Sequence, residues 1–355
     1  NLTVKMEDNS TLLMLAEPSA PVYLNALPGV TGINIDPSSS TNYKKLSQYK
    51  GQFFINKNVD MDNPTDDYVQ TSLISAKSEL MSGYTIAGSE AGEVAMKSGA
   101  NASIISNADV SAVNNGTINL SGDNSVGLYT NYGTNTNNSN LSVTGTKGVG
   151  IFAENGSLVS NTGNITIGNK GVGIYAVSFQ DASNEPLFGD KKINVTNSGQ
   201  ITANVGSQAV GIYLNNNKGL AVSDAVLNLG SGIIDVKASD GGIGVYTDKI
   251  QVSGAGTITV GKNGVGIYAK DSDLYLNGVN INLHGDNALG LYLSGSTNLW
   301  TGNGNIDING QNAVLFNMDT AAGNTINNNF TVSAAAGSTY TLGNIVQGAI
   351  TYTGN

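Results

Sequence analysis

A short apolar phrase with an alternating pattern recurs along most of this chain. The phrase has an aromatic residue in its fifth position, and its copies read SVGLYT at 125–130, GVGIFA at 148–153, GVGIYA at 171–176, AVGIYL at 209–214, GIGVYT at 242–247, GVGIYA at 264–269 and ALGLYL at 288–293. The aromatics recur at a nearly constant interval, which is lengthened twice. A regular short period, broken by two insertions, indicates stacked copies of one small unit, which is a solenoid.

Each copy is preceded by a second segment that also alternates apolar with polar or small residues. Its copies are GTIN at 116–119, GNIT at 163–166, GTIT at 256–259, VNIN at 279–282 and GNID at 304–307. Alternation is the pattern of a β-strand, because successive side chains point to opposite faces. The second segment is therefore predicted to be a strand.

A third, fainter segment lies earlier in each unit. It is marked by Leu158, by Ile193 with Val195, by Leu220 with Val222, by Ile250 with Val252, and by Leu274 with Leu276. Three short strands with their turns account for about 23 residues, which is the period of the repeat. The predicted fold class is all-β, a right-handed three-sided parallel β-helix (solenoid) with about 23 residues per coil and loop insertions.

The phrase GVGIYA at 171–176 predicts which side chains face the core. Strict alternation places Val172, Ile174 and Ala176 on one face and Gly173 with Tyr175 on the other. The first face is aliphatic in nearly every copy, so we expect it to lie inside. Each buried aliphatic side chain contributes on the order of 1.5–3 kcal/mol, and the opposite register would expose these rows to water.

A turn is predicted immediately before each phrase. This turn is marked by the residue five positions before the aromatic. In successive copies it is Asn124, Lys147, Lys170, Gln208, Asn263 and Asn287, and Asn312 precedes Asn317, which replaces the aromatic. Asn tolerates a left-handed backbone, so we expect that conformation in this column. Asn side chains stacked in successive coils are also expected to hydrogen-bond along the axis.

The chain is expected to divide into three parts. Residues 1–64 are an irregular N-terminal cap or a continuation of the solenoid, with strands at Leu12–Leu15, Ile33–Ile35 and Phe53–Ile55. Residues 65–320 form the regular coils, with insertions at 177–192 and 215–233, and Asp66–Met81 is either a helix or a decorated coil. Residues 321–355 form divergent C-terminal coils. About a dozen coils would make a rod on the order of 60 Å long.

Composition narrows the classes of function. The chain has 46 Gly and 48 Asn in 355 residues, which suits a solenoid rich in turns. With no Cys, disulfides and thiol chemistry are excluded. The net charge is −10 and every base is Lys, so nucleic acid is not an expected partner. No signal peptide is visible at Asn1, and we expect the chain to be a segment of a longer protein.

The first candidate site is the column of aromatics, which the alternation places outside. It comprises Tyr129, Phe152, Tyr175, Tyr213, Tyr246, Tyr268 and Tyr292. Exposed rings at steps of about 4.8 Å would offer a stacking surface for the apolar faces of sugar rings. We expect Tyr175, Tyr213, Tyr246 and Tyr268 to contact such a ligand. The structural alternative is that each ring covers the Gly two residues before it.

The second candidate is the insertion VSFQDASNEPLFGDKK at 177–192. Its Phe179 and Phe188 make it too apolar for a plain linker. Insertions on a rigid scaffold are common recognition sites, and the alternative is an excursion without a function. These two aromatics complete the set of predicted ligand-binding residues.

The sequence gives less evidence for metal binding or catalysis. The acidic cluster Asp60, Asp62, Asp66 and Asp67 lacks the Gly and distal Glu of a calcium loop, which favours a solvated turn. His284 is the only histidine and is predicted to lie in a turn. The acid pairs that could be proposed are Asp271 with Asp273 and Asp235 with Asp240. Acids this close are common by chance, so we expect no catalytic residue, metal ion or cofactor.

One family shares these motifs. The GVGIYA phrase, the segments at Gly163–Gly168 and Gly256–Gly261, and SGQI at Ser198–Ile201 resemble the passenger regions of large type V autotransporter adhesins. The likeness is greatest to the giant outer-membrane adhesins of fusobacteria, and it covers roughly residues 65–320. It implies a β-helix that is exported through a C-terminal outer-membrane barrel and extends from the cell surface. A chain without Cys is consistent with that route.

The resemblance implies a role in virulence, as a surface adhesin that mediates coaggregation or attachment to other cells. The expected partners are glycans or proteins on host or bacterial surfaces, and contact with a membrane would pass only through the barrel, which is missing from this chain. The rod itself is expected to be a monomer. Two alternatives stay open: a β-helical stalk that binds nothing, and a β-helix enzyme that acts on polysaccharide.

Overall fold

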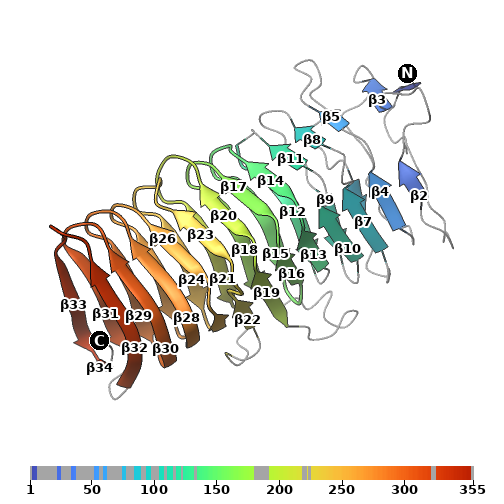
Figure 1. Cartoon of the computed structure of the whole chain (residues 1–355). Coiled ribbons are helices and arrows are strands. Elements are labelled where there is room, and N and C mark those ends of the chain that lie inside the picture. Colours follow the sequence, from blue (N-terminus) through green and yellow to red (C-terminus); the bar gives the residue numbers. More distant parts are fainter. Residues whose placement is uncertain are drawn as a thin grey trace.

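The computed structural model describes residues 123–131, 134–179, 192–217, 222, 225–320 and 325–352, together with the strands before residue 121. Figure 1 shows short strands that are stacked side by side along one axis, from the N-terminal to the C-terminal end of the rod. Every strand pairing is parallel, and no helix of the α type occurs among the described residues. The chain is therefore a parallel β-helix, as the repeat predicts.

Each coil contributes one strand to each of three columns. The first column is an 11-stranded sheet that contains the repeated phrase. Its strands are β6 (Ile74–Ala76), β9 (Ile104–Asn107), β12 (Val126–Asn131), β15 (Val149–Glu154), β18 (Val172–Ser178), β21 (Val210–Asn216), β24 (Ile243–Asp248), β27 (Val265–Lys270), β29 (Leu289–Gly295), β31 (Ala313–Thr320) and β33 (Tyr340–Gln347).

From β6 onward, the second column follows the first in each coil. Its strands are β2 (Val22–Leu24), β4 (Gln52–Ile55), β7 (Tyr84–Gly88), β10 (Val110–Asn114), β13 (Thr134–Asn137), β16 (Leu158–Asn161), β19 (Ile193–Asn197), β22 (Ala225–Asn228) and β25 (Gln251–Gly254). The third column consists of β5 (Val59–Met61), β8 (Glu93–Met96), β11 (Thr117–Leu120), β14 (Asn140–Val143), β17 (Asn164–Ile167), β20 (Gln200–Ala203), β23 (Ile233–Val236) and β26 (Thr257–Val260).

Toward the C-terminus the second and third columns merge into longer strands. β28 (Asp273–Leu283) pairs with both β25 and β26, and β30 (Asn298–Ile308), β32 (Thr325–Ala334) and β34 (Ala349–Tyr352) continue the stack. Near the N-terminus β1 (Leu2–Lys5) pairs only with β3 (Ile33–Asp36) among the described strands.

Among the coils without insertions, those at the C-terminal end of the rod are the longest. Tyr246 pairs in register with Tyr268, whereas Asn317 pairs with Asn344, which lies further along the sequence from its partner. The predicted period therefore holds for coils such as that from Tyr246 to Tyr268, and the last coils are larger. β33 pairs only with β31 within the described chain, and its Ile345 and Val346 are 49% and 64% exposed.

The predicted register is right for the second half of the phrase and wrong for the first half. Ile174 and Ala176 are fully buried and Tyr175 faces outward, as predicted. Gly173, however, is buried next to Ile174, and Val172 is only half-buried. Two consecutive residues thus face the core, so strict alternation fails at the glycine. Tyr175 does not cover Gly173, and the structural alternative for the aromatic column is wrong in that detail.

Close packing explains why glycine occupies this inward position. A Cβ atom on Gly173 would lie 2.5 Å from the carbonyl oxygen of Gly211 in the next coil. It would also lie 2.5 Å from Cγ2 of Ile201, which packs inside from β20. Real Cβ atoms do not approach other atoms so closely. The inward glycine lets the phrase strand bend toward the core without a clash.

The predicted left-handed column is confirmed. Positive φ angles of 54° to 59° occur at Asn124, Lys147, Lys170, Gln208, Asn263, Asn287 and Asn312. Gly241 supplies the equivalent position of the remaining coil with φ 66°. One predicted axial hydrogen bond also forms, from Asn287 Nδ2 to Asn263 Oδ1 at 3.2 Å. Lys and Gln adopt the same conformation, which shows that the turn geometry outweighs residue preference.

A second asparagine column is fully buried, and the sequence patterns did not predict it. Asn114, Asn137, Asn161 and Asn197 end successive strands of the second column and are 0% exposed. Each of the first three donates from Nδ2 to Oδ1 of the next, at 2.8, 2.8 and 2.7 Å. Leu229 takes the equivalent place in the following coil and is also buried. The ladder satisfies amides that would otherwise be buried without partners.

Outside the regular phrases the strand predictions have mixed outcomes. β3 and β4 confirm the strands expected at Ile33–Ile35 and Phe53–Ile55, while Leu12–Leu15 lies outside the described residues. A strand, β6, lies within Asp66–Met81, where a helix was one of the two possibilities. The strand expected at Leu220 with Val222 was misplaced, because the apolar pair that enters the core is Ala225 and Leu227 in β22.

Candidate functional site

The aromatic column lies on the outer face of the first column of strands. Register pairs join Phe152 to Tyr175, Tyr175 to Tyr213, and so on through Tyr246, Tyr268 and Tyr292. All of these side chains are partly exposed, and Tyr129 heads the column, although its side chain lies outside the description. The structure therefore brings the four predicted ligand-binding tyrosines into one continuous row.

The tyrosine rings stack on one another rather than standing apart. Ring centroids are 4.8 Å apart for Tyr175 and Tyr213 and 4.6 Å for Tyr213 and Tyr246, with planes within 3° of parallel. The next two steps measure 5.0 Å and 4.5 Å and end at Tyr292. Phe152 closes the other end edge-on to Tyr175, at 5.2 Å and 80°. From Tyr175 to Tyr292, neighbouring rings therefore cover one another's faces, while each side chain stays partly exposed.

Partial burial raises the pKa of three hydroxyl groups in this row, those of Tyr175, Tyr246 and Tyr292. Burial raises the pKa of the Tyr175 phenol above its usual value, and the proximity of Tyr213 and Glu154 raises it further. The pKa of Tyr246 is raised mainly by burial and then by its neighbours Tyr213 and Asp248. These two tyrosines therefore stay neutral donors and acceptors over the physiological pH range.

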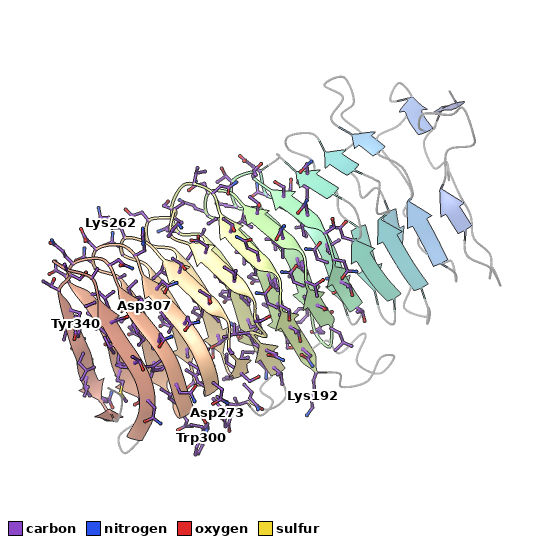
Figure 2. The ribbon with its side chains drawn as sticks, in the orientation of Figure 1. Lys192, Lys262, Asp273, Trp300, Asp307 and Tyr340 are labelled. Carbon is purple, nitrogen blue, oxygen red and sulfur yellow. The ribbon has the colours of Figure 1, made fainter. Side chains whose placement is uncertain are left out.

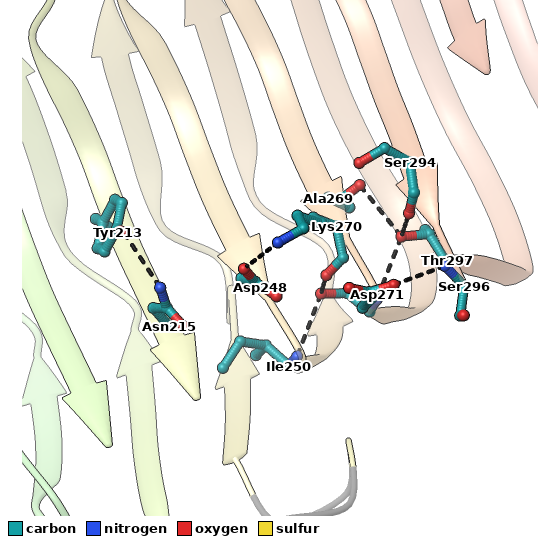
Figure 3. Close-up of polar contacts among 11 residues, drawn as sticks. Tyr213, Asn215, Asp248, Ile250, Ala269, Lys270, Asp271, Ser294, Ser296 and Thr297 are labelled. Carbon is teal, nitrogen blue, oxygen red and sulfur yellow. Dashed lines mark hydrogen bonds and ion pairs between the residues drawn. The ribbon is translucent and has the colours of Figure 1, made fainter. Parts of the chain in front are cut away.

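Polar side chains border the tyrosines along the corner between the first and second columns (Figure 3). Lys270 donates from Nζ to Asp248 Oδ2 at 3.0 Å, and this hydrogen bond raises the pKa of the Lys270 ammonium group. Asn215 Nδ2 donates to the Tyr213 hydroxyl oxygen at 3.4 Å. The first of these contacts links neighbouring coils, and the second lies within β21.

The same corner contains a buried hydroxyl relay (Figure 3). Ser272 Oγ accepts from the amide of Ile250 at 3.2 Å and donates to the carbonyl oxygen of Lys270 at 2.8 Å. Thr297 Oγ1 accepts from the Ser272 amide at 3.2 Å and donates to the Ser294 carbonyl at 2.7 Å. The relay satisfies backbone groups where the chain turns, so its role is structural.

The insertion is described only at its ends. Phe179 follows β18 directly, is 38% exposed, and donates its amide hydrogen to Asn155 Oδ1 at 3.2 Å. Residues 180–191, with Phe188, lie outside the described residues. For the second expected insertion, β21 extends to Asn216 and β22 begins at Ala225, so the segment between the strands is 217–224.

Each of the acidic candidates has a polar partner of its own. Asp271 Oδ1 accepts from the Ser296 amide at 2.8 Å, and Asp273 Oδ1 accepts from Asn298 at 3.0 Å. Asp235 forms an ion pair with Lys237 at 3.2 Å, whereas Asp240 accepts from Asn263 at 2.7 Å. Each carboxylate therefore accepts a hydrogen bond or an ion pair at its own turn or strand.

The remaining candidates for metal binding are His284 and the acidic cluster near residue 60. His284 is exposed in the turn after β28, as predicted, and its amide donates to the Val260 carbonyl at 2.9 Å. Within the described chain, no three acidic or histidine side chains gather as a metal site would require. Asp60 lies in β5, whereas Asp62, Asp66 and Asp67 lie outside the described residues.

The sequence patterns did not predict one aromatic pair at the surface. Trp300 is 59% exposed, and its ring lies nearly parallel to that of Tyr275, with centroids 6.4 Å apart and planes 10° apart. Figure 2 shows Trp300 projecting from the rod beside Asp273. The phrase repeat does not include either aromatic, but Trp300 is the only tryptophan in the chain, and that was the available signal.

The fold thus defines a class of protein, the parallel β-helix, with an outward tyrosine row and a separate exposed tryptophan. Comparison with models of known protein families, with characterised proteins and with solved structures finds no match to this chain. Where the chain is described, no helix has the length and hydrophobicity that crossing a membrane requires. Function must therefore be argued from the geometry of this rod and its outer faces.

Proposed function

We propose that this chain is a segment of a cell-surface adhesin of the autotransporter passenger type, and that it mediates attachment between cells by binding surface glycans or proteins. The proposal places it outside the cell, at the surface of a bacterium with an outer membrane. The support is the combination of the repeated GVGIYA phrase with a parallel β-helix. An elongated rod of this kind displays side chains at regular intervals on long outer faces.

The single observation that carries the proposal is the continuity of the stack. Eleven strands of the first column pair in parallel (Figure 1), and the tyrosine row lies on the outer face of that sheet. Such a rod resists bending because neighbouring coils share backbone hydrogen bonds, stacked rings and amide ladders. These properties suit a protein that must hold a binding surface away from the cell that carries it.

A second candidate function is a stalk that binds nothing itself. The geometry of the tyrosine row favours this role for the row alone, since face-to-face stacking uses the ring surfaces that a sugar would need. Each stacked pair contributes about 0.5–1.5 kcal/mol beyond its buried area. Ligand binding by Tyr175, Tyr213, Tyr246 and Tyr268 stays a prediction, and it would have to use ring edges and hydroxyl groups.

The double substitution Tyr175→Ala with Tyr268→Ala separates the two roles of this row. If the row only stiffens the rod, the variant will have a lower melting temperature and unchanged attachment to cells. If the row binds ligand, attachment will fall while the far-ultraviolet circular dichroism spectrum is retained. A variant with Tyr175→Phe and Tyr268→Phe keeps the rings and serves as the matched control.

Competition tests the adhesive function itself. Soluble chain added to a mixture of adhesin-bearing bacteria and their partner cells should reduce coaggregation in a saturable manner. A protein of similar size and charge should have no effect. If coaggregation does not change at saturating concentrations of folded chain, the adhesive proposal is contradicted and the stalk function is favoured.

A binding rather than a catalytic role is proposed because the described carboxylates are already engaged. Asp271 and Asp235, the candidates for acid catalysis, each accept a hydrogen bond from, or pair with, a neighbour in the same turn or coil. A glycoside hydrolase would need two carboxylates facing each other across a sugar.

A further inference from the structure

The outer face of β28 and β30 carries an aromatic pair that the stability of the rod does not explain. We propose that Trp300 and Tyr275, with the polar side chains on either side of them, form a binding site for a pyranose ring of a cell-surface glycan. The inference rests on the proposed adhesive function and names a site for it. It differs from the tyrosine row, because the Trp300 ring is largely open to solvent.

A β-bulge places Trp300 in this position. Leu274 pairs with Leu299, and the next pair joins Tyr275 to Thr301, so Trp300 is an extra residue in β30. Leu299 is buried, while Trp300 and Thr301 both face outward. Bulges commonly redirect a side chain next to a functional site. Here the bulge adds an indole to the surface without disturbing the buried positions on either side.

Tyr275 fixes the orientation of the indole. The two rings are 10° from parallel with centroids 6.4 Å apart, within the range of offset aromatic pairs. Tyr275 itself is only partly exposed and is anchored between the buried residues Leu274 and Leu276. A side chain that is already oriented loses less entropy when it binds a ligand. The pair is therefore a preformed flat surface.

Hydrogen-bonding side chains border the aromatic pair on both sides along the strands. On one side Asn298 Nδ2 donates to Asp273 Oδ1 at 3.0 Å, and on the other Asn303 Nδ2 donates to Asn277 Oδ1 at 3.3 Å. The second oxygen of Asp273 and the amide oxygen of Asn298 take no part in that bond. Acidic and amide groups at the edge of an aromatic surface are what sugar hydroxyl groups require, since each hydroxyl both donates and accepts.

This chemistry favours a sugar over a protein as the ligand. A tryptophan that anchors a protein interface usually lies within an apolar patch that excludes water. Apart from Tyr275, the described outward neighbours of Trp300 on β28 and β30 are Asp273, Asn298, Thr301 and Asn303, which are all polar. One ring face with a polar border matches a single pyranose, which is apolar on its C–H face and polar at its rim. The flat shape implies weak affinity for one sugar and a need for several contacts per cell.

The only tryptophan in the chain makes the site directly observable. Fluorescence excited selectively in the indole should respond saturably to a binding sugar, with emission shifted to shorter wavelength as Trp300 loses water. The probes are the methyl glycosides of glucose, galactose and mannose, N-acetylglucosamine, and glycans released from cells that the chain attaches to. At least one of them should produce the shift in the wild-type chain.

Substitutions then assign the binding to the site. Trp300→Ala should weaken glycan and cell binding at least about tenfold, equivalent to about 1.4 kcal/mol, and Trp300→Phe should weaken binding less. Leu158→Ala is the matched control, because Leu158 is 49% exposed on the outer face of β16 and should have no effect. Trp300 is exposed, so the variants should keep the wild-type circular dichroism spectrum and melting temperature.

The outcomes separate failure of the site from failure of the proposed function. If cell binding survives Trp300→Ala and no probe changes the fluorescence, the proposed site is wrong and the adhesive function stands. Binding that requires Trp300 but survives periodate oxidation of cell-surface sugars would overturn the sugar in favour of a protein ligand. A folded wild-type chain that binds no cell and no glycan would overturn both proposals.

Discussion

Asn137 donates from Nδ2 to Oδ1 of Asn161 one coil further along the rod, at 2.8 Å, and both side chains are completely buried. Each of these two amides is a donor to one coil and an acceptor from another. A break at one rung leaves a buried donor and a buried acceptor unpaired in the flanking coils. The ladder therefore fixes which coil stacks on which, in addition to stabilising the corner.

Replacing Asn161 by Ala should be strongly destabilising for this reason. Asn137 would lose its acceptor and Asn197 its donor, at about 1–3 kcal/mol for each unsatisfied group. The neighbouring Asn164 makes a similar bond to Asn140, at 3.1 Å, but on the exposed face. Asn164→Ala should cost less than about 1 kcal/mol. Denaturant unfolding of both variants checks the difference, and equal losses would show that burial of the ladder has no energetic effect.

Gly173→Ala should destabilise the central coils by about 3 kcal/mol, because the new methyl group would meet Gly211 and Ile201 at 2.5 Å. Gly241→Ala is the comparison. Gly241 has a positive φ but nothing within 4 Å of its Cβ position, so its cost should be about 1 kcal/mol. Thermal unfolding of the two variants measures the difference. A larger loss for Gly241→Ala would mean that backbone strain outweighs close packing here.

Lys170→Asn should stabilise the protein. Lys170 has φ 54°, a left-handed conformation that costs most L-residues about 1–2 kcal/mol and that Asn tolerates. We expect a gain of about 0.5–1 kcal/mol in the free energy of unfolding. Lys170→Ala removes the same side chain without easing the backbone, so it should give no gain. If the two variants were equally stable, loss of the lysine side chain and not backbone conformation would be the cause.

Alkaline pH should weaken the tyrosine row. The pKa values of Tyr175, Tyr246 and Tyr292 are raised, mainly by burial, so the folded chain binds these protons more tightly than the unfolded chain. Their contribution to stability is complete below about pH 10 and is lost as pH rises through the folded-state values. The melting temperature of wild type should fall more steeply above about pH 10 than that of Tyr246→Phe. Parallel curves would contradict this coupling.

The periodicity of the sequence was sufficient to predict the fold. Alternation repeated at a short and regular period specified three parallel strands per coil, and the column of Asn124 and its equivalents located the left-handed turns. Register was harder, because the alternation rule assumes a regular strand. The inward Gly173 next to the inward Ile174 depends on contacts with the following coils, which no local pattern reports.

The sites were less accessible to sequence reasoning. The outward row of tyrosines could be predicted, but their mutual stacking depends on ring orientations that are set by the neighbouring coils. Trp300 is a single extra residue outside the phrase, and only the pairing of β28 with β30 identifies it as a bulge. The buried asparagines repeat at intervals close to those of the phrase, so a signal for the ladder is present in the sequence.

The most direct test of the adhesive function is saturable binding of the fluorescently labelled, folded chain to the surface of living bacterial and host cells. We predict a saturable component that excess unlabelled chain displaces, that periodate treatment of the cells removes, and that Trp300→Ala reduces while Leu158→Ala does not. A chain with the wild-type circular dichroism spectrum that shows only non-saturable binding to every cell type would contradict the adhesive function.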